Sequence, residues 1–465
     1  MSNLSYFNYN NIQDQITNHE LYVTIGSVSN SNLSTEQGIK EGFIFGKKAK
    51  STDFAALVDK ITWTSGTVYN GWTTGSNFFI INSTNDVFKC ISNNNGIAST
   101  AEPLTKSNSI ITTSDGYRWK YMFTVSSSDL TKFSYTGKIP ITANSSVVAN
   151  AISGTIDYVY VANTGTNYIA YNSGNINSVV ANNLLQISNT ASQVTDIYSG
   201  STIYAVYGTG AGTLATISNS YSNTIGRYIT LSSNVSFATD TNYIISPKVN
   251  ISDRFGTGFS AYSTINAVNG IDKIIILNPG SNYRSPIITI TSSTGSGAVI
   301  TPYVAPFGGH GSNPFNELNS NSAMISVNFL NAEDTTLPTN LTFYASSLVS
   351  QPTVSVFGQN TASYGISCNV TSTFSVNDIL TGATSNATGR AYYSNTTHVK
   401  INDINGTFVT NEVVTNQIGV NSAINIIKSS DVITESGTII KYNTHSSGIN
   451  RASNTSENIK FIFKI

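Results

Sequence analysis

The chain has 465 residues and a formal net charge of −1, and only 10% of its residues are charged, where globular proteins usually carry about 25%. Hydrophobic residues make up 39%, so Asn, Ser and Thr, rather than apolar residues, take the place of the missing charges. No run of Lys and Arg is available to neutralise phosphates, which argues against nucleic-acid binding, and no apolar run reaches the ~18 residues that a membrane span needs.

Residues 1–150 are predicted to form a β-rich N-terminal core domain. The first residues, MSNLSYFNYNN, lack the basic and apolar regions of a signal peptide. A helix is predicted over 51–61, because Ser51 can cap it and the apolar residues that follow recur at helical spacing. We expect another helical turn at 127–133 and short strands elsewhere.

The segment 87–125 is the most informative part of the chain. Its Asp115-Gly116 dipeptide is a strong turn signal, after which the residues alternate between two faces. One face is aromatic and apolar and the other is mostly polar: Tyr117, Trp119, Tyr121, Phe123 and Val125 against Arg118, Lys120, Met122 and Thr124. The pattern predicts a strand whose aromatic face anchors a core. The alternative is an exposed aromatic stripe that binds sugar faces.

The two cysteines, Cys90 and Cys368, lie far apart in the sequence. Cys90 falls in a predicted strand and is expected to be a small buried thiol. So few cysteines fit a protein that folds in a reducing compartment.

Residues 151–305 are predicted to form an inserted β domain with an internal repeat. The segment 156–168 aligns with 271–283, and each copy reads as a strand, an Asn-X-Gly turn and a Tyr that can fold back onto the strand. Between the copies, Gly208-Thr-Gly210-Ala-Gly212 has the wrong spacing for a dinucleotide-binding loop and precedes no helix, so it predicts a turn.

Residues 306–364 are predicted to return to the core domain, and they contain the best catalytic candidate, His310 between glycines. A working histidine also needs an orienting carboxylate and a nucleophile or metal partners. The four histidines, His19, His310, His398 and His445, show no metal-ligand spacing. A structural role is therefore the preferred interpretation of His310.

Residues 365–430 are predicted to form a small accessory β module, and 431–465 a C-terminal segment that rejoins the core. Within the module, Asp403, Asn405 and Glu412 have part of the spacing of a calcium loop, but Ile401 occupies its first ligand position and strands flank it. A β-turn is the preferred interpretation.

Several separated motifs follow one another in a defined order. They are WTSGTVY at 63–69, VFKC at 87–90, NNNG at 93–96, AST at 98–100, DGYRWKYMF at 115–123, KIP at 138–140, GGHGSNP at 308–314 with Glu317-Leu318, and NRASNTSENIKFI at 450–462. In this combination the chain resembles the baseplate wedge subunit called gene product eight in contractile-tailed, T-even-like bacteriophages. The resemblance covers roughly the first third of the chain, resumes in patches around 306–350, and returns at the C-terminus.

The motif positions are predicted to be structural rather than catalytic. They are Trp63, Gly66, Tyr69, Cys90, Asn94, Gly96, Asp115, Gly116, Tyr117, Trp119, Tyr121, Gly309, His310, Gly311, Arg451 and Glu457.

The resemblance implies a non-enzymatic structural subunit of the phage tail baseplate wedge. Such a subunit would be a homodimer bonded to other wedge subunits, and it would help to transmit the rearrangement that triggers sheath contraction. It would be located in the virion after folding and assembly in the host bacterial cytoplasm.

The residues themselves predict a mainly β fold, with multidomain β-sandwich or β-barrel-like modules and a few short helices. They indicate no catalytic residues, no metal, no cofactor and no small-molecule substrate. A charge-poor surface suits a protein that stays packed against neighbours, although an A/T-rich genome would also favour Asn. Two alternatives remain: a receptor-binding, adhesin-like tail protein with glycan-binding modules, and a tail depolymerase with paired acids.

Overall fold

The computed structural model describes residues 20–27, 35–72, 76–330, 337, 339–433, 435–453 and 455–464. Within them, strands account for 49% and helices for 6%, and the four α-helices are short, which confirms the predicted mainly β fold. No helix in these ranges has the length and hydropathy to cross a bilayer.

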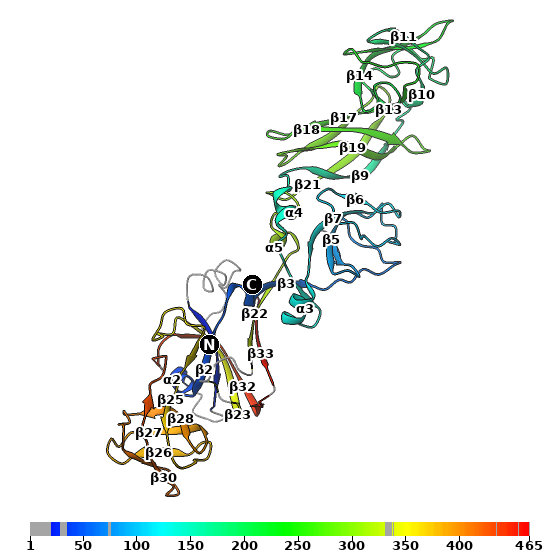
Figure 1. Ribbon diagram of the computed structural model, residues 1–465. Coiled ribbons are helices and arrows are strands. Elements are labelled where there is room, and N and C mark those ends of the chain that lie inside the picture. The colour runs from blue at the N-terminus through cyan, green and yellow to red at the C-terminus, as the bar shows by residue number, and fades with distance from the viewer. Residues whose placement is uncertain are drawn as a thin grey trace. The chain divides into compact units, whose positions relative to one another are not determined.

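The chain divides into two compact units (Figure 1). Unit 1 contains Met1–Asp59, Ser127–Ile141 and Asn319–Ile465, and unit 2 contains Lys60–Ser126 and Thr142–Leu318. Residues 1–150, taken as one domain in the sequence, thus contribute to both.

Unit 1 contains three antiparallel sheets. The first has the order β24 (Thr361–Ser363), β2 (Phe43–Lys48), β1 (Leu21–Gly26), β23 (Leu341–Ser350) and β32 (Thr438–Arg451). The second has the order β33 (Glu457–Lys464), β22 (Ser322–Phe329), β3 (Phe54–Asp59) and β8 (Lys138–Pro140). The third, in the 365–430 region, has the order β30 (Asn421–Ala423), β29 (Val413–Thr415), β26 (Ile379–Gly382), β27 (Thr388–Ser394), β28 (His398–Asn405), β25 (Ile366–Asn369) and β31 (Ile427–Lys428).

The first two sheets form a β-sandwich. Val23 of β1, Phe45 of β2, Ile325 of β22 and Phe461 of β33 are buried in one shared core. The C-terminal strand β33 lies in the same sheet as β3 from the N-terminal part of the chain. Segments far apart in sequence therefore share one sheet. The third sheet has its own core but is not separate, since Tyr392 of β27 is buried in the sandwich core.

The helix predicted over 51–61 is wrong. Ser51–Asp53 form a single 3₁₀ turn, η1, and β3 begins at Phe54. Four consecutive residues of β3, Ala55 to Val58, are buried. Phe54 packs against the sandwich core, whereas Ala55 and Leu57 contact Phe133 on the other side of the sheet. A short apolar run buried on both faces has no period of two, so periodicity did not separate it from a helix.

The other helices are short. The turn predicted at 127–133 is confirmed as α3 (Ser127–Lys132), and α2 (Glu36–Glu41) also belongs to unit 1. Unit 2 contains α4 (Ser145–Ala149) and α5 (Pro314–Glu317).

Unit 2 begins with a four-stranded sheet that contains the aromatic strand. Its order is β4 (Phe79–Ile81), β5 (Asp86–Ser92), β7 (Arg118–Thr124) and β6 (Ile111–Thr112). The predicted strand is confirmed, and its aromatic face is buried. The opposite face differs from the expectation of a polar surface, because Lys120 and Met122 are also buried.

The 151–305 region contains three sheets and two cores. One sheet has the order β10 (Asn172–Asn175), β16 (Asn242–Ser246), β13 (Thr202–Tyr207), β14 (Leu214–Ser222), β15 (Arg227–Leu231), β12 (Leu184–Ile187) and β11 (Ser178–Ala181) around its own core. A second sheet has the order β17 (Lys248–Ser252), β20 (Ile287–Thr291), β21 (Ser296–Val304) and β9 (Ile156–Thr166). The third sheet pairs β18 (Thr257–Ile265) with β19 (Ile271–Ser281). The second and third sheets share the second core.

The internal repeat is confirmed as a repeated structure. β9 and β19 each end in a left-handed glycine, Gly165 at φ +62° and Gly280 at φ +60°. The tyrosine after each strand folds back, and its hydroxyl accepts a backbone N–H: Ala298 donates to Tyr168 at 3.3 Å and Phe259 to Tyr283 at 3.1 Å.

Candidate functional site

Six of the predicted motif positions lie in or against one aromatic core in unit 2: Trp63, Tyr69, Cys90, Tyr117, Trp119 and Tyr121. The Trp119 ring stacks on Tyr117 with centroids 5.4 Å apart and meets the Tyr69 ring edge-on at 5.6 Å. Burial raises the pKa of the Cys90 thiol, which keeps it protonated. The aromatic stripe is therefore packing core rather than an exposed sugar-binding surface.

Asp115 organises the turn that precedes β7. Its Oδ2 accepts hydrogen bonds from the N–H groups of Thr100 and Ala101 at 2.8 and 3.0 Å and from the Ser99 hydroxyl at 2.9 Å. Burial alone would raise the pKa of Asp115, but these donors and the Thr113 hydroxyl lower the pKa to about 2. The ionised Asp115 carboxylate thus joins the loop at 99–101 to the turn before β7.

Four more motif positions complete this turn. The Asn94 amide donates to the Asp115 carbonyl at 3.1 Å, and Gly66 N–H donates to the Ser99 carbonyl at 2.8 Å. Gly66, Gly96 and Gly116 all have positive φ. A Cβ on Gly116 would lie 2.5 Å from Asn94 Nδ2. Glycine at position 116 therefore lets the Asn94 side chain pack closely against the turn.

Gly309 and Gly311 hold His310 in a tight loop. Both glycines have positive φ, +91° and +81°. A Cβ on Gly309 would lie 2.4 Å from the backbone nitrogen of Ile152, and one on Gly311 would lie 2.3 Å from the Val147 side chain. The loop places the imidazole inside the unit, where it is 5% exposed.

The imidazole belongs to a buried charge cluster centred on Glu317. His310 Nδ1 hydrogen-bonds Glu317 Oε1, which also accepts from Lys89 Nζ at 2.8 Å, and Gly311 N–H donates to Oε2 at 2.7 Å. Burial on its own raises the pKa of Glu317, but His310, Lys89 and the Gly311 N–H lower the pKa to about 2. The carboxylate is thus ionised, and His310 Nδ1 carries the proton that it donates.

Trp72 closes one side of the cluster. Lys89 Nζ lies 4.9 Å from the centroid of its ring, and the His310 ring meets it edge-on at 5.0 Å. A cation over an indole face is a favourable contact, so Lys89 is held by both a carboxylate and a ring.

Three cations lie on one face of the β5–β7 pair. Lys89 is directly opposite Lys120 in the register, and Arg118 is two residues before Lys120 on β7. Lys120 Nζ donates to the Asn108 carbonyl at 2.5 Å, and the Arg118 guanidinium donates to the Asp157 carbonyl at 2.5 Å. Burial lowers the pKa of both Arg118 and Lys120.

His310 Nε2 faces Asp157 Oδ2 at 3.7 Å and forms no hydrogen bond with any described residue. Hence no hydroxyl or thiol of the described chain is hydrogen-bonded to it, as the nucleophile of a Ser–His or Cys–His pair would be. The described residues also bring together no group of three or more His, Cys, Asp and Glu side chains suited to a metal.

Arg451 and Glu457, the last two motif positions, lie in unit 1. Arg451 is 1% exposed at the end of β32, and its guanidinium donates to the Glu457 carboxylate at the start of β33. It also donates to the carbonyls of Phe329, at 3.4 Å, and Leu330. Because β32 and β33 belong to different sheets, the pair ties the sandwich together.

His398 and His445 have separate hydrogen-bond partners. His398 is exposed and its Nδ1 lies 2.8 Å from the Thr397 hydroxyl, whereas His445 Nε2 lies 3.3 Å from Ser346 Oγ. His19 lies outside the described residues.

The glycine motif at 208–212 forms a turn, as predicted. Gly208, Gly210 and Gly212 all have positive φ in the connection between β13 and β14. The β-turn predicted at the calcium-like motif is wrong, because Asp403 and Asn405 lie in strand β28, where its pairing with β27 shifts register. Asp403 pairs with Arg390 at 3.4 Å. Glu412 instead accepts from the backbone of the 384–385 and 409 positions, so the two carboxylates of the calcium-like motif have separate partners.

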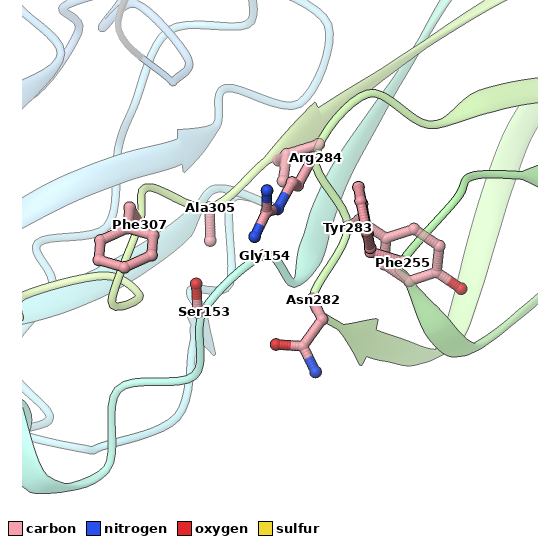
Figure 2. Close-up of a pocket in the computed structure, with 9 residues that line it drawn as sticks. Ser153, Gly154, Phe255, Asn282, Tyr283, Arg284, Ala305 and Phe307 are labelled. Atoms are coloured by element: carbon pink, nitrogen blue, oxygen red, sulfur yellow. The ribbon is translucent and has the colours of Figure 1, made fainter.

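A cavity of about 770 Å³ lies at the turn of the second repeat. Figure 2 shows Phe307 on the opposite side of it from Phe255 and Tyr283, with Arg284 between them in this view. Phe307 and Phe255 are 93% and 49% exposed, and the Arg284 guanidinium lies 4.6 Å from the centroid of the Phe255 ring.

Sequence reasoning placed His310, Glu317, Lys89 and Lys120 in motifs but missed that Lys89 pairs with Glu317 and that Asp157 faces His310. The available signal was the scarcity of charge: in a chain with 10% charged residues, Lys89 and Lys120 each interrupt an apolar strand. No protein-family model, no curated protein and no solved structure matches this chain.

Proposed function

We propose that this chain is a structural subunit of the tail baseplate wedge of a contractile-tailed bacteriophage. In this role it forms a homodimer, binds other wedge subunits, and helps to transmit the rearrangement that triggers sheath contraction. It acts in the virion and folds in the host cytoplasm.

The observation that carries the proposal is the resemblance in the order of separated motifs, from 63–69 to 450–462. The way those residues pack supports a mechanical role. Asp115 joins a loop to a strand, Glu317 neutralises a buried lysine, and Arg451 links two sheets. We infer that buried polar contacts of this kind favour one arrangement of the neighbouring elements.

Cryo-electron microscopy of virions that encode this chain tests the proposal. The expected result is density for the chain in the wedges around the tail hub, with contacts to other wedge proteins. Absence of the chain from purified virions, by mass spectrometry and in the density, would refute it.

A second candidate is a receptor-binding tail protein, and the cavity in Figure 2 is the observation that favours it. Exposed aromatic rings beside a guanidinium can stack on and hydrogen-bond a sugar. Density at a fibre tip, together with glycan binding that is lost in Phe255→Ala, would favour this function over the wedge.

A further inference from the structure

A cavity of about 420 Å³ lies beside the cationic face of the β5–β7 pair in unit 2. The side chains of Arg118, Lys120, Asp157 and His310 line it. Its volume lies in the range of about 300–1,000 Å³ that is typical of small-ligand sites.

The two cations at this cavity make no direct ion pair with a carboxylate among the described residues, although Asp157 attracts both of them electrostatically. The ion pairs of these residues include Lys89 with Glu317 but neither Arg118 nor Lys120. Each of the two donates to one backbone carbonyl instead. Lys120 is 5% exposed, and a cation buried without a counter-charge costs stability.

The pairing register of β5 and β7 adds a like-charge contact to this face. Lys120 lies directly opposite Lys89 on the same face, and like charges in that position repel. Glu317 is taken up by Lys89, His310 and the Gly311 N–H. Asp157 accepts from the Thr155 hydroxyl. Lys89, Lys120 and Arg118 therefore share two carboxylates, Glu317 and Asp157, which leaves this group one positive charge in excess.

His310 forms part of the cavity wall. The ring is 5% exposed, it lines the cavity, and its Nε2 has no hydrogen-bond partner among the described residues. Its Nδ1 is fixed on Glu317, so the ring is already oriented.

We propose that this cavity binds a compact oxyanion, a carboxylate or a phosphate, through Lys120 and the Arg118 guanidinium. The anion supplies the missing counter-charge, and ammonium and guanidinium groups are the usual donors for both chemistries. The cavity leaves room for the molecule or side chain that carries the anionic group. The inference stands on these contacts and does not depend on the wedge assignment.

The test is thermal melting of the full chain during titration with sodium phosphate or sodium acetate, at ionic strength matched with sodium chloride. We expect a saturable rise in Tm with at least one anion, because a ligand that binds only the folded state stabilises it. Phosphate also stabilises proteins generally by exclusion from their surface, so the response is compared between variants.

Lys120→Met and Arg118→Gln should weaken the apparent affinity at least tenfold. Lys273→Met, which removes an exposed lysine of β19, should respond like the wild type. Should Lys120→Met fail to fold, Arg118→Gln decides. A response to phosphate alone assigns a phosphate ligand, and one at least as strong to acetate assigns a carboxylate. The proposal is overturned by the same response in wild type and both site variants, or by no saturable response in the wild type.

Discussion

At the scale of single residues, Trp119 has the largest fully buried side chain among the described residues. It is fully buried between Tyr69 and Tyr117. Trp119→Ala should lower the free energy of unfolding by ~3–5 kcal/mol, because it removes buried apolar area and leaves a cavity. Urea unfolding measures the loss, and Tyr160→Ala, at a residue that is 46% exposed, is the control. Wild-type stability of Trp119→Ala would mean that the aromatic face is not core.

Glu317 gives unit 2 a pH-dependent stability. Its pKa is about 2 in the folded protein, below the ordinary value of 4.5. A lowered carboxyl pKa stabilises the fold fully above about pH 4.5, and this stabilisation is lost as the pH falls toward 2. The shift corresponds to about 3 kcal/mol.

Glu317→Gln should therefore be less stable than the wild type at neutral pH, since Lys89 loses its buried counter-charge. The difference in Tm between the two proteins should narrow between pH 4.5 and pH 2. Asp272→Asn, at an exposed carboxylate, serves as the matched control. A gap that stays constant down to the lowest measurable pH would contradict an ionised Glu317.

At the scale of elements, the repeat offers a matched set of glycine substitutions. A Cβ on Gly280 would lie 2.5 Å from the Thr257 carbonyl oxygen, and one on Gly165 would lie 2.5 Å from that of Ser296. Gly212 has a similar left-handed φ, +88°, but no atom within 4 Å of an added Cβ.

Gly212→Ala should therefore cost only the strain of the left-handed conformation, about 1–2 kcal/mol. Gly280→Ala and Gly165→Ala should each cost more, because the backbone of the paired strand must move. Denaturant midpoints at unchanged slope measure the difference. Equal midpoints for the three variants would show that the close approach of paired strands does not matter.

The same elements show what sequence could predict. β7 was predictable because its period of two is strong and Asp115-Gly116 marks its start. β3 was not, because burial on both faces removes the alternation. The charge cluster was only half predictable. His310 and Glu317 lie seven residues apart in one motif. The contact of Glu317 with Lys89 and that of His310 with Asp157 depend on how distant strands pack.

At the scale of the whole molecule, the surface composition bears on assembly. A charge content of 10% gives copies of the chain little electrostatic repulsion. A two-fold contact is the commonest closed arrangement and avoids the open filaments that a head-to-tail contact can produce. The resemblance to a wedge subunit implies the same state.

The purified chain should therefore be a symmetric dimer. An obligate interface of this kind should bury upward of ~2,000 Å², so dissociation should not precede unfolding. Because folding is then coupled to association, Tm should rise with protein concentration. Sedimentation velocity and light scattering measure the mass directly. A monomer at micromolar concentration would contradict the dimer, and a trimer would favour the adhesin-like function, because tail fibres and spikes are commonly three-fold.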